Sequence, residues 1–102
     1  MKVQIINRDN FDEIISSDKP VLVDFYADWC GPCRMLKPVL EDVASEREDI
    51  IVGKINVDDE AYLANRYGVF SIPTLILFKN GEVVRQASGA KPKAQVLALI
   101  DG

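Results

Sequence analysis

The only two cysteines of this chain, Cys30 and Cys33, are separated by just Gly31 and Pro32. A nearly unbroken apolar run at residues 21–27 precedes them, and apolar positions at helical spacing follow them. Two thiols at this spacing can close a small disulfide ring, and a helix start beside the first sulfur favours its charged form. The segment therefore predicts a redox site that passes two electrons between disulfides. This site would lie between a buried strand and a helix.

Strand and helix patterns alternate along the chain. Apolar runs predict strands at residues 3–6, 21–27, 50–57, 74–78 and 83–87. Helical spacing and capping signals predict four helices that begin near residues 10, 30, 58 and 92, the third with Asp58 or Asp59 as its cap. Steps from strand to helix to strand predict parallel pairing, whereas Asn80-Gly81 predicts a hairpin. We expect one α/β domain, residues 1–102, in which helices cover both faces of a mixed sheet and the cysteines follow its central strand.

Composition excludes several classes of function. The net charge is −4 and no cluster of Lys and Arg stands out, so nucleic acid is not an expected partner. No apolar run approaches the roughly 18 residues that a membrane span needs. Two cysteines and no histidine do not complete a four-ligand zinc site, so we expect no metal. Without histidine, a proton near the thiols must pass to a carboxylate, a lysine, water or the other thiol.

The two cysteines are expected to have different roles. Cys30 lies at or just before the helix N-terminus, where its pKa should fall, so we interpret it as the attacking nucleophile. Cys33 lies one turn further in and should be less exposed, so we interpret it as the resolving thiol. Pro32 stiffens the turn, Gly31 lets a substrate backbone approach, and Trp29 offers a flat apolar surface. The alternatives are a structural pair or half of a metal site.

Two charged residues lie within the apolar strands. Asp24 shares a strand face with Leu22 and Tyr26, where burial would raise its pKa and let it accept a proton from Cys33. The alternative is an acid that caps backbone groups at a strand end. Lys54 would approach Asp24 if their strands are neighbours, although most lysines simply lie on the surface.

Several separate segments of the chain resemble the thioredoxin family. The motif Trp-Cys-Gly-Pro-Cys is that family's active-site sequence, letter for letter. The resemblance covers nearly the whole chain and includes Val23-Asp24-Phe25, Lys54, Ile72-Pro73-Thr74, the run from Phe78 to Val83, and Gly89-Ala90. It implies the thioredoxin fold, a central mixed five-stranded sheet flanked by four helices.

The resemblance also implies an activity and partners. Thioredoxins are cytoplasmic, monomeric dithiol proteins that reduce disulfides in proteins such as ribonucleotide reductase and peroxiredoxins. They bind no cofactor tightly, and thioredoxin reductase recharges them with electrons from NADPH. By the same resemblance, Asp24 serves proton transfer at Cys33, Lys54 lies near that acid, and Pro73 follows a cis peptide bond facing the disulfide.

A docking surface around the sulfurs is expected as well. Its residues would be Trp29, Gly31, Pro32, Ile72, Gly89 and Ala90, and the remaining aromatic side chains are expected in the core. The chain departs from the common family pattern at Tyr26, Ser71 and Ser88, which bears on affinity for particular partners. Two other functions stay open at this point: a disulfide oxidase or isomerase on the same fold, and a binding subunit that does not use its thiols.

Overall fold

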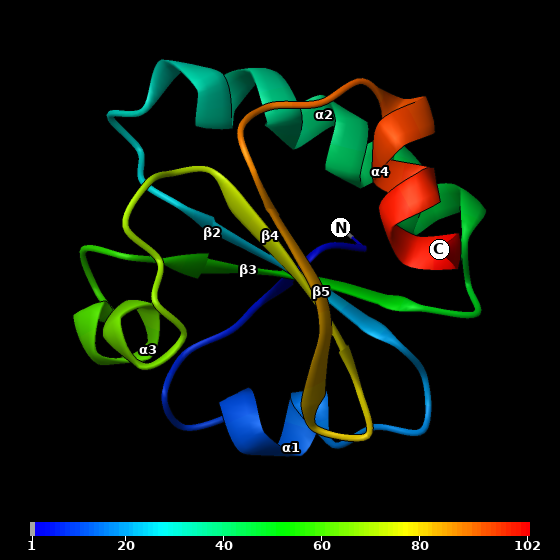
Figure 1. Ribbon diagram of the computed structural model, residues 1–102, viewed down its shortest axis with the longest axis horizontal. Helices are drawn as coiled ribbons and strands as arrows, with labels where there is room; N and C mark the ends of the chain where they lie inside the picture. The colour runs from blue at the N-terminus through cyan, green and yellow to red at the C-terminus, as the bar shows by residue number, and fades with distance from the viewer. Residues whose placement is uncertain (1) are drawn as a thin grey trace.

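The fold is a five-stranded sheet covered by helices on both faces (Figure 1). The structure is a computed structural model that describes residues 2–102. The strand order is β1-β3-β2-β4-β5, with β2 in the middle. In chain order the elements are β1 (Gln4–Ile5), α1 (Phe11–Ile15), β2 (Val21–Tyr26), α2 (Gly31–Glu46), β3 (Ile51–Asn56), α3 (Ala61–Arg66), β4 (Thr74–Lys79), β5 (Glu82–Ser88) and α4 (Lys93–Asp101). The expected mixed sheet of five strands with four helices is confirmed.

One step of the predicted pairing is wrong. β1, β3 and β2 are parallel, but β4 runs antiparallel to β2, although α3 stands between β3 and β4. Six helical residues extend about 9 Å, whereas a strand of six residues extends about 20 Å. The short α3 therefore does not return the chain to the start of β3, and the chain enters β4 from the end of the sheet at which β3 finishes. The Asn80-Gly81 hairpin then leads into the antiparallel β5, as predicted.

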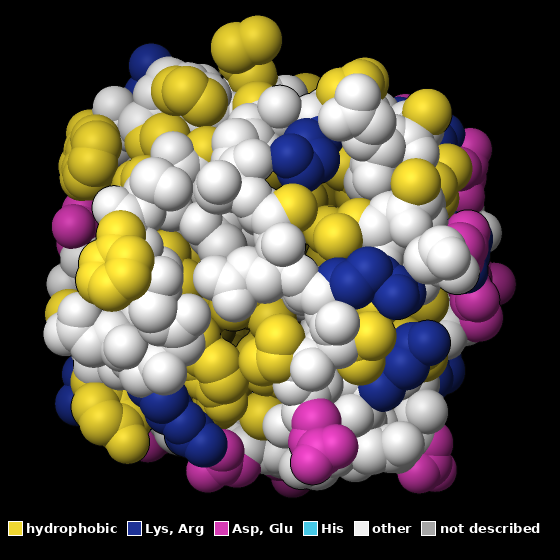
Figure 2. All heavy atoms as spheres, in the orientation of Figure 1, with side chains coloured by type: hydrophobic (Ala, Val, Ile, Leu, Met, Phe, Trp, Pro, Cys, Tyr) yellow, Lys and Arg dark blue, Asp and Glu magenta, His cyan; other side chains and the backbone are white. Residues whose placement is uncertain are grey.

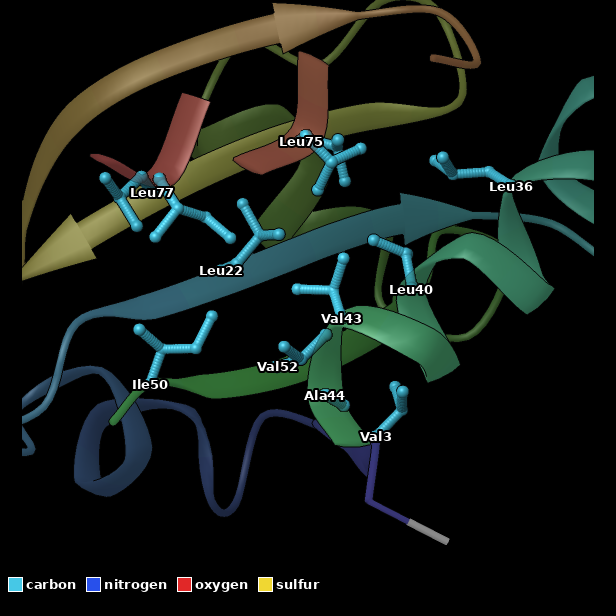
Figure 3. Packing of buried hydrophobic residues seen from close by; sticks show 12 residues of the cluster. Val3, Leu22, Leu36, Leu40, Val43, Ala44, Ile50, Val52, Leu75 and Leu77 are labelled. Carbon is cyan, nitrogen blue, oxygen red and sulfur yellow. The ribbon is translucent and has the colours of Figure 1, made fainter. Parts of the chain in front are cut away.

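The central strands are buried on both faces, which explains their apolar runs. Alternate side chains point to opposite faces of a strand. Leu22, Leu75 and Leu77 pack against α2 and α4, where their neighbours include Leu36, Leu40, Val43, Val96 and Ile100 (Figure 3). Val23, Ile76 and Phe78 point the other way and pack against α1 and α3, with Phe11, Ile15 and Leu63 among their neighbours. Two hydrophobic layers therefore fix β2 and the chain that leaves it.

The predicted cap of α3 is wrong. The residue at the helix start is Glu60, and neither Asp58 nor Asp59 caps it. The carboxylate of Asp58 accepts a hydrogen bond from the indole Nε1 of Trp29 instead, at 2.9 Å. The Glu60 side chain is buried and accepts hydrogen bonds from Arg8. These acids therefore connect segments that lie far apart in the sequence.

Candidate active site

The two cysteines form a disulfide where β2 passes into α2. Cys30 is the N-cap residue of α2, and its Sγ accepts a hydrogen bond from the backbone N–H of Cys33 at 3.2 Å. Pro32 lies in the first turn, where its missing N–H leaves no intrahelical bond unmade. A donor and the positive end of a 16-residue helix thus face the sulfur of Cys30, and both stabilise a negative charge on it.

Exposure does not separate the two sulfurs as expected. In the disulfide form Cys30 is 5% exposed and Cys33 is 4% exposed, so both are buried. They differ in what surrounds them. Cys30 precedes the helix and faces the loop before β4, whereas Cys33 lies inside the first turn and lines a cavity. The two cysteines therefore differ in their surroundings and not in their exposed area.

The loop before β4 lies against the disulfide. The Ile72–Pro73 peptide bond is cis, as the resemblance implies. The carbonyl oxygen of Ile72 is 3.8 Å from the Sγ of Cys30. The backbone N–H of Gly89 donates to the carbonyl of Pro73 at 2.8 Å, which holds the end of β5 beside this loop. The structure therefore brings Cys30, Ile72, Pro73 and Gly89 together, as predicted from positions spread along the chain.

The other predicted docking residues border this site. Trp29 is 69% exposed, and its hydrogen bond to Asp58 holds the indole ring beside the redox turn. Pro32 and Ala90 are exposed, and Gly31 has nothing closer than 4.0 Å to the place of an added Cβ. The sulfurs are thus approached across small or apolar groups, an arrangement suited to an incoming polypeptide backbone.

Asp24 is a buried carboxyl in the middle of the central strand. It is 5% exposed, and its Oδ1 has no hydrogen-bond partner among the described residues. Burial raises the pKa of Asp24 from 3.8 to about 7, while the nearby charge of Lys54 opposes the rise. Asp24 lies inside β2 and not at its end, so the alternative of an acid that caps a strand end is wrong. At neutral pH this carboxyl is poised to accept or release a proton.

A cavity of about 280 Å³ joins Asp24 to the redox pair. Both Asp24 and Cys33 line it, together with Val3, Tyr26, Ala27, Asp28, Arg34, Lys37, Leu40, Glu41 and Lys54. A water molecule occupies about 30 Å³ of liquid volume, so a cavity of this size has room for several. A proton can therefore move between Cys33 and Asp24 without direct contact between them.

Lys54 faces this cavity from the neighbouring strand. It is the register partner of Asp24 in the parallel pair of β2 and β3, as expected if those strands are neighbours. Its side chain is half-buried, and its Nζ lies 5.3 Å from the centre of the Tyr26 ring. The ammonium group therefore stays near Asp24 while packing over an aromatic face.

Replacing Lys54→Met is expected to raise the pKa of Asp24 above its value of about 7, because the charge that opposes the rise is removed. The measurement is a titration of the Asp24 carboxyl by nuclear magnetic resonance in the oxidised protein. Lys91→Met is the control, because Lys91 does not line the cavity and donates to the backbone of Ser88. An unchanged or lowered midpoint would contradict the assigned coupling.

Sequence reasoning missed two exposed aromatic residues. Tyr62 is 70% exposed and Phe70 is 95% exposed, so the expectation that the remaining aromatic side chains lie in the core is wrong for both. Phe70 stands two residues before Ile72 in the loop that contacts Cys30. That position in a loop was the signal available in the sequence, since an apolar side chain in a short surface loop has no core face to occupy.

Among residues 2–102, no helix combines the length and the apolar character that crossing a membrane requires.

Comparison with known proteins identifies relatives along the whole chain. The thioredoxin family model matches residues 2–102. A thioredoxin from Alicyclobacillus acidocaldarius is 53% identical over 92 residues, which cover 89% of this chain and 88% of that protein. A thioredoxin from Chlamydia pneumoniae is 52% identical over 99 residues, which cover 97% of this chain and 96% of that protein. The chain is also 48% identical over 96 residues to a bifunctional thioredoxin reductase/thioredoxin from Mycobacterium leprae, covering 93% of this chain and 21% of that protein.

A solved structure agrees with this result. A mutant thioredoxin from Halobacterium salinarum superposes with a TM-score of 0.89 at 43% sequence identity, covering 97% of this chain and 87% of that one.

Proposed function

This chain belongs to the thioredoxin family, and we propose that it reduces disulfide bonds of other proteins with Cys30 as the nucleophile and Cys33 as the resolving thiol. Family membership and the Cys30–Cys33 pair support a disulfide-reductase function of the thioredoxin type. The observation that carries the assignment of roles is the position of Cys30 as N-cap of α2, where its sulfur already accepts the N–H of Cys33.

In the first step the thiolate of Cys30 attacks one sulfur of a target disulfide. A bond forms between Cys30 and that sulfur, the target's S–S bond breaks, and the target's other sulfur leaves as a thiolate. The helix N-terminus and the N–H of Cys33 both stabilise negative charge on this sulfur and so favour the thiolate that attacks. The product is a mixed disulfide between the two proteins.

In the second step Cys33 releases the target. Its thiol gives up its proton, attacks Cys30 and displaces the target's remaining sulfur as a thiol or thiolate. This chain ends with the Cys30–Cys33 disulfide, and the target ends with two thiols, so two electrons have passed to the target. We assign Asp24 as the acceptor of the Cys33 proton, because both groups line one cavity and a pKa of about 7 leaves this carboxylate partly charged at neutral pH. Lys54 is a positioning residue that moderates the pKa of Asp24.

The reduced form must then be regenerated. We propose a thioredoxin reductase as the donor, with NADPH used by that reductase and with no cofactor held by this chain. The relative from Mycobacterium leprae, named as a reductase and a thioredoxin in one protein, supports a partner of this class. We further propose that its targets are proteins of the ribonucleotide reductase and peroxiredoxin type. We also propose that the chain is a monomer located in the cytoplasm. A compartment that keeps thiols reduced suits a dithiol reductant.

The alternatives differ in the direction of electron flow and in the need for thiols. In a disulfide oxidase or isomerase of this fold, a histidine between the cysteines would favour the thiolate and make the disulfide more oxidising. Here the two residues between the cysteines are Gly31 and Pro32. A binding subunit would retain its function after both cysteines were replaced by serine.

The test is reduction of insulin disulfides by the wild-type chain in dithiothreitol, followed by turbidity of the released B chain. The proposal predicts catalysis well above dithiothreitol alone. Equilibration with a glutathione redox buffer should show that the dithiol gives electrons to glutathione disulfide. A chain that instead oxidises reduced glutathione under the same conditions would be an oxidase.

A further inference from the structure

The aromatic residues of this chain fall into a buried set and an exposed set. Of the eight, Phe11, Phe25 and Phe78 are buried in the sheet's core, and Tyr26 and Tyr67 are half-buried. Trp29, Tyr62 and Phe70 are the aromatic residues among the large hydrophobic side chains that are exposed. Single exposed apolar residues are ordinary, so the question is whether these three share a place.

The topology brings all three to one end of the sheet. β2 and β3 are parallel, so Trp29, just after β2, and Tyr62, in the helix after β3, lie beyond the same end. β4 is antiparallel to β2, so Phe70, just before β4, lies at that end too. Figure 2 shows hydrophobic side chains projecting along the left edge of the molecule, where Figure 1 places α3 and the neighbouring loops. The exposed aromatic residues therefore surround the end of the sheet that carries the disulfide.

Phe70 belongs to the loop that contacts the reacting sulfur. Consecutive Cα atoms are about 3.8 Å apart, so the Cα of Phe70 is at most about 8 Å from that of Ile72, whose carbonyl is 3.8 Å from the Cys30 Sγ. The ring rests beside Gly68, where an added Cβ would be 3.9 Å from Phe70 Cε2, and the side chain is otherwise 95% exposed. Nearly all of its apolar surface is thus available to a partner.

We propose that Phe70 determines substrate specificity by binding an aliphatic or aromatic side chain two residues from the reacting cysteine of an extended target segment. In an extended segment, side chains two residues apart share one face and lie about 7 Å apart. The Cα atoms of Phe70 and Ile72 are at most about 8 Å apart, so the two residues can contact neighbouring positions of such a segment. Burying that side chain against Phe70 removes apolar surface from water on both partners. The acids Asp58 and Asp59 beside this surface are exposed and disfavour an anionic membrane as the occupant. The inference rests on the proposed reductase function and adds to it a preference among targets.

The test uses two synthetic disulfide-linked peptide dimers that differ only at the positions two residues before and after the cysteine, which hold leucine in one and serine in the other. The small molecule 2-hydroxyethyl disulfide serves as a substrate too short to reach Phe70. Pre-reduced protein is mixed with each disulfide under single-turnover conditions. The fluorescence of Trp29, the only tryptophan, follows the second-order rate.

The wild type is expected to react about tenfold faster with the leucine peptide than with the serine peptide, a factor that corresponds to about 1.4 kcal/mol. Phe70→Ala should remove this preference and leave the rate with 2-hydroxyethyl disulfide unchanged, whereas Phe70→Leu should keep most of it. The matched control is Val83→Ala, which truncates an exposed apolar side chain next to the hairpin at the opposite end of β4.

The outcomes separate this inference from the proposed function. A Phe70→Ala protein that keeps the full preference, or a wild type without one, would overturn the specificity role while leaving the reductase intact. A wild type that reacts with none of the three disulfides would overturn both. Sedimentation that shows a dimer broken by Phe70→Ala would mean that a second copy of this chain covers the surface, which also contradicts the proposal.

Discussion

The Cys33→Ser variant is expected to trap target proteins on this chain as mixed disulfides. The Cys30→Ser variant is expected to reduce insulin disulfides no faster than dithiothreitol alone. The two results differ because the attacks are sequential. Without Cys30 no sulfur faces both the helix N-terminus and the Ile72 loop, so the first bond does not form. Without Cys33 the first bond forms but nothing inside the chain displaces the target.

The measurement is a non-reducing gel of a cell extract passed over each immobilised variant, with the trapped proteins released by dithiothreitol. The double replacement Cys30→Ser with Cys33→Ser is the control for binding that does not involve thiols. Trapping by Cys30→Ser but not by Cys33→Ser would reverse the assigned roles. Equal recovery on the double variant would favour the alternative of a binding subunit.

Asp24→Asn is expected to stabilise the oxidised protein in a pH-dependent way. The pKa of Asp24 is about 7 in the folded chain and close to the ordinary value of 3.8 in the unfolded chain, so the folded state binds more protons between these values. Wild-type stability should therefore fall as the pH rises from about 4 to about 7, and it should stay low above that. At about 1.36 kcal/mol per pKa unit, the wild type loses about 4 kcal/mol of its free energy of unfolding over this range. The Asn side chain does not titrate, so the Asp24→Asn protein does not lose this stability.

The stability test is denaturant unfolding of both proteins from pH 4 to pH 9. The difference between them should be smallest near pH 4 and largest above pH 7. Asp28→Asn is the matched control, because Asp28 is an exposed acid that lines the same cavity. Parallel stability curves for wild type and Asp24→Asn would mean that Asp24 titrates normally and has no special role.

The same substitution should slow turnover. Loss of the base that accepts the Cys33 proton is expected to lower the insulin-reduction rate at pH 7 by up to about 100-fold, the lower end of what general acid–base catalysis contributes. In wild type the rate of the second step should rise with pH around 7, as the carboxyl loses its own proton. The Asp24→Asn protein should lack that rise. A more stable but slower variant would show that burial of this acid serves the reaction and not folding.

Local sequence patterns were sufficient for most of the fold because the signals were strong and short in range. The apolar runs of β2 and β4 reflect burial on both faces of the sheet, which sequence periodicity reports directly. The direction of β4 was not accessible, because it depends on where the short α3 leaves the chain in space. The cap of α3 was misassigned because Asp58 binds Trp29, a residue 29 positions away.

The site shows the same division. Three residues of the site are of a type that is unusual in its local context, so each could be recognised in the sequence: Cys30, Cys33 and the buried acid Asp24. The cavity that links Asp24 to Cys33 was not visible, because its lining comes from β2, β3, α2, the loop between β2 and α2, and the segment before β1. Phe70 was assigned to the core by its type alone, although its position in a loop was a signal against that assignment, and the structure shows it to be exposed.

The cavity beside Asp24 has a consequence for how this small domain can adapt to heat. Larger apolar side chains that fill such a space gain dispersion contacts with its walls, and cavity filling is a common route to greater thermal resistance. Here the unfilled volume lies between the strand that carries the acid and the helix that carries the resolving sulfur. Larger side chains at Val3 or Leu40, two of the aliphatic residues that line this space, would therefore favour thermal stability at the expense of proton transfer.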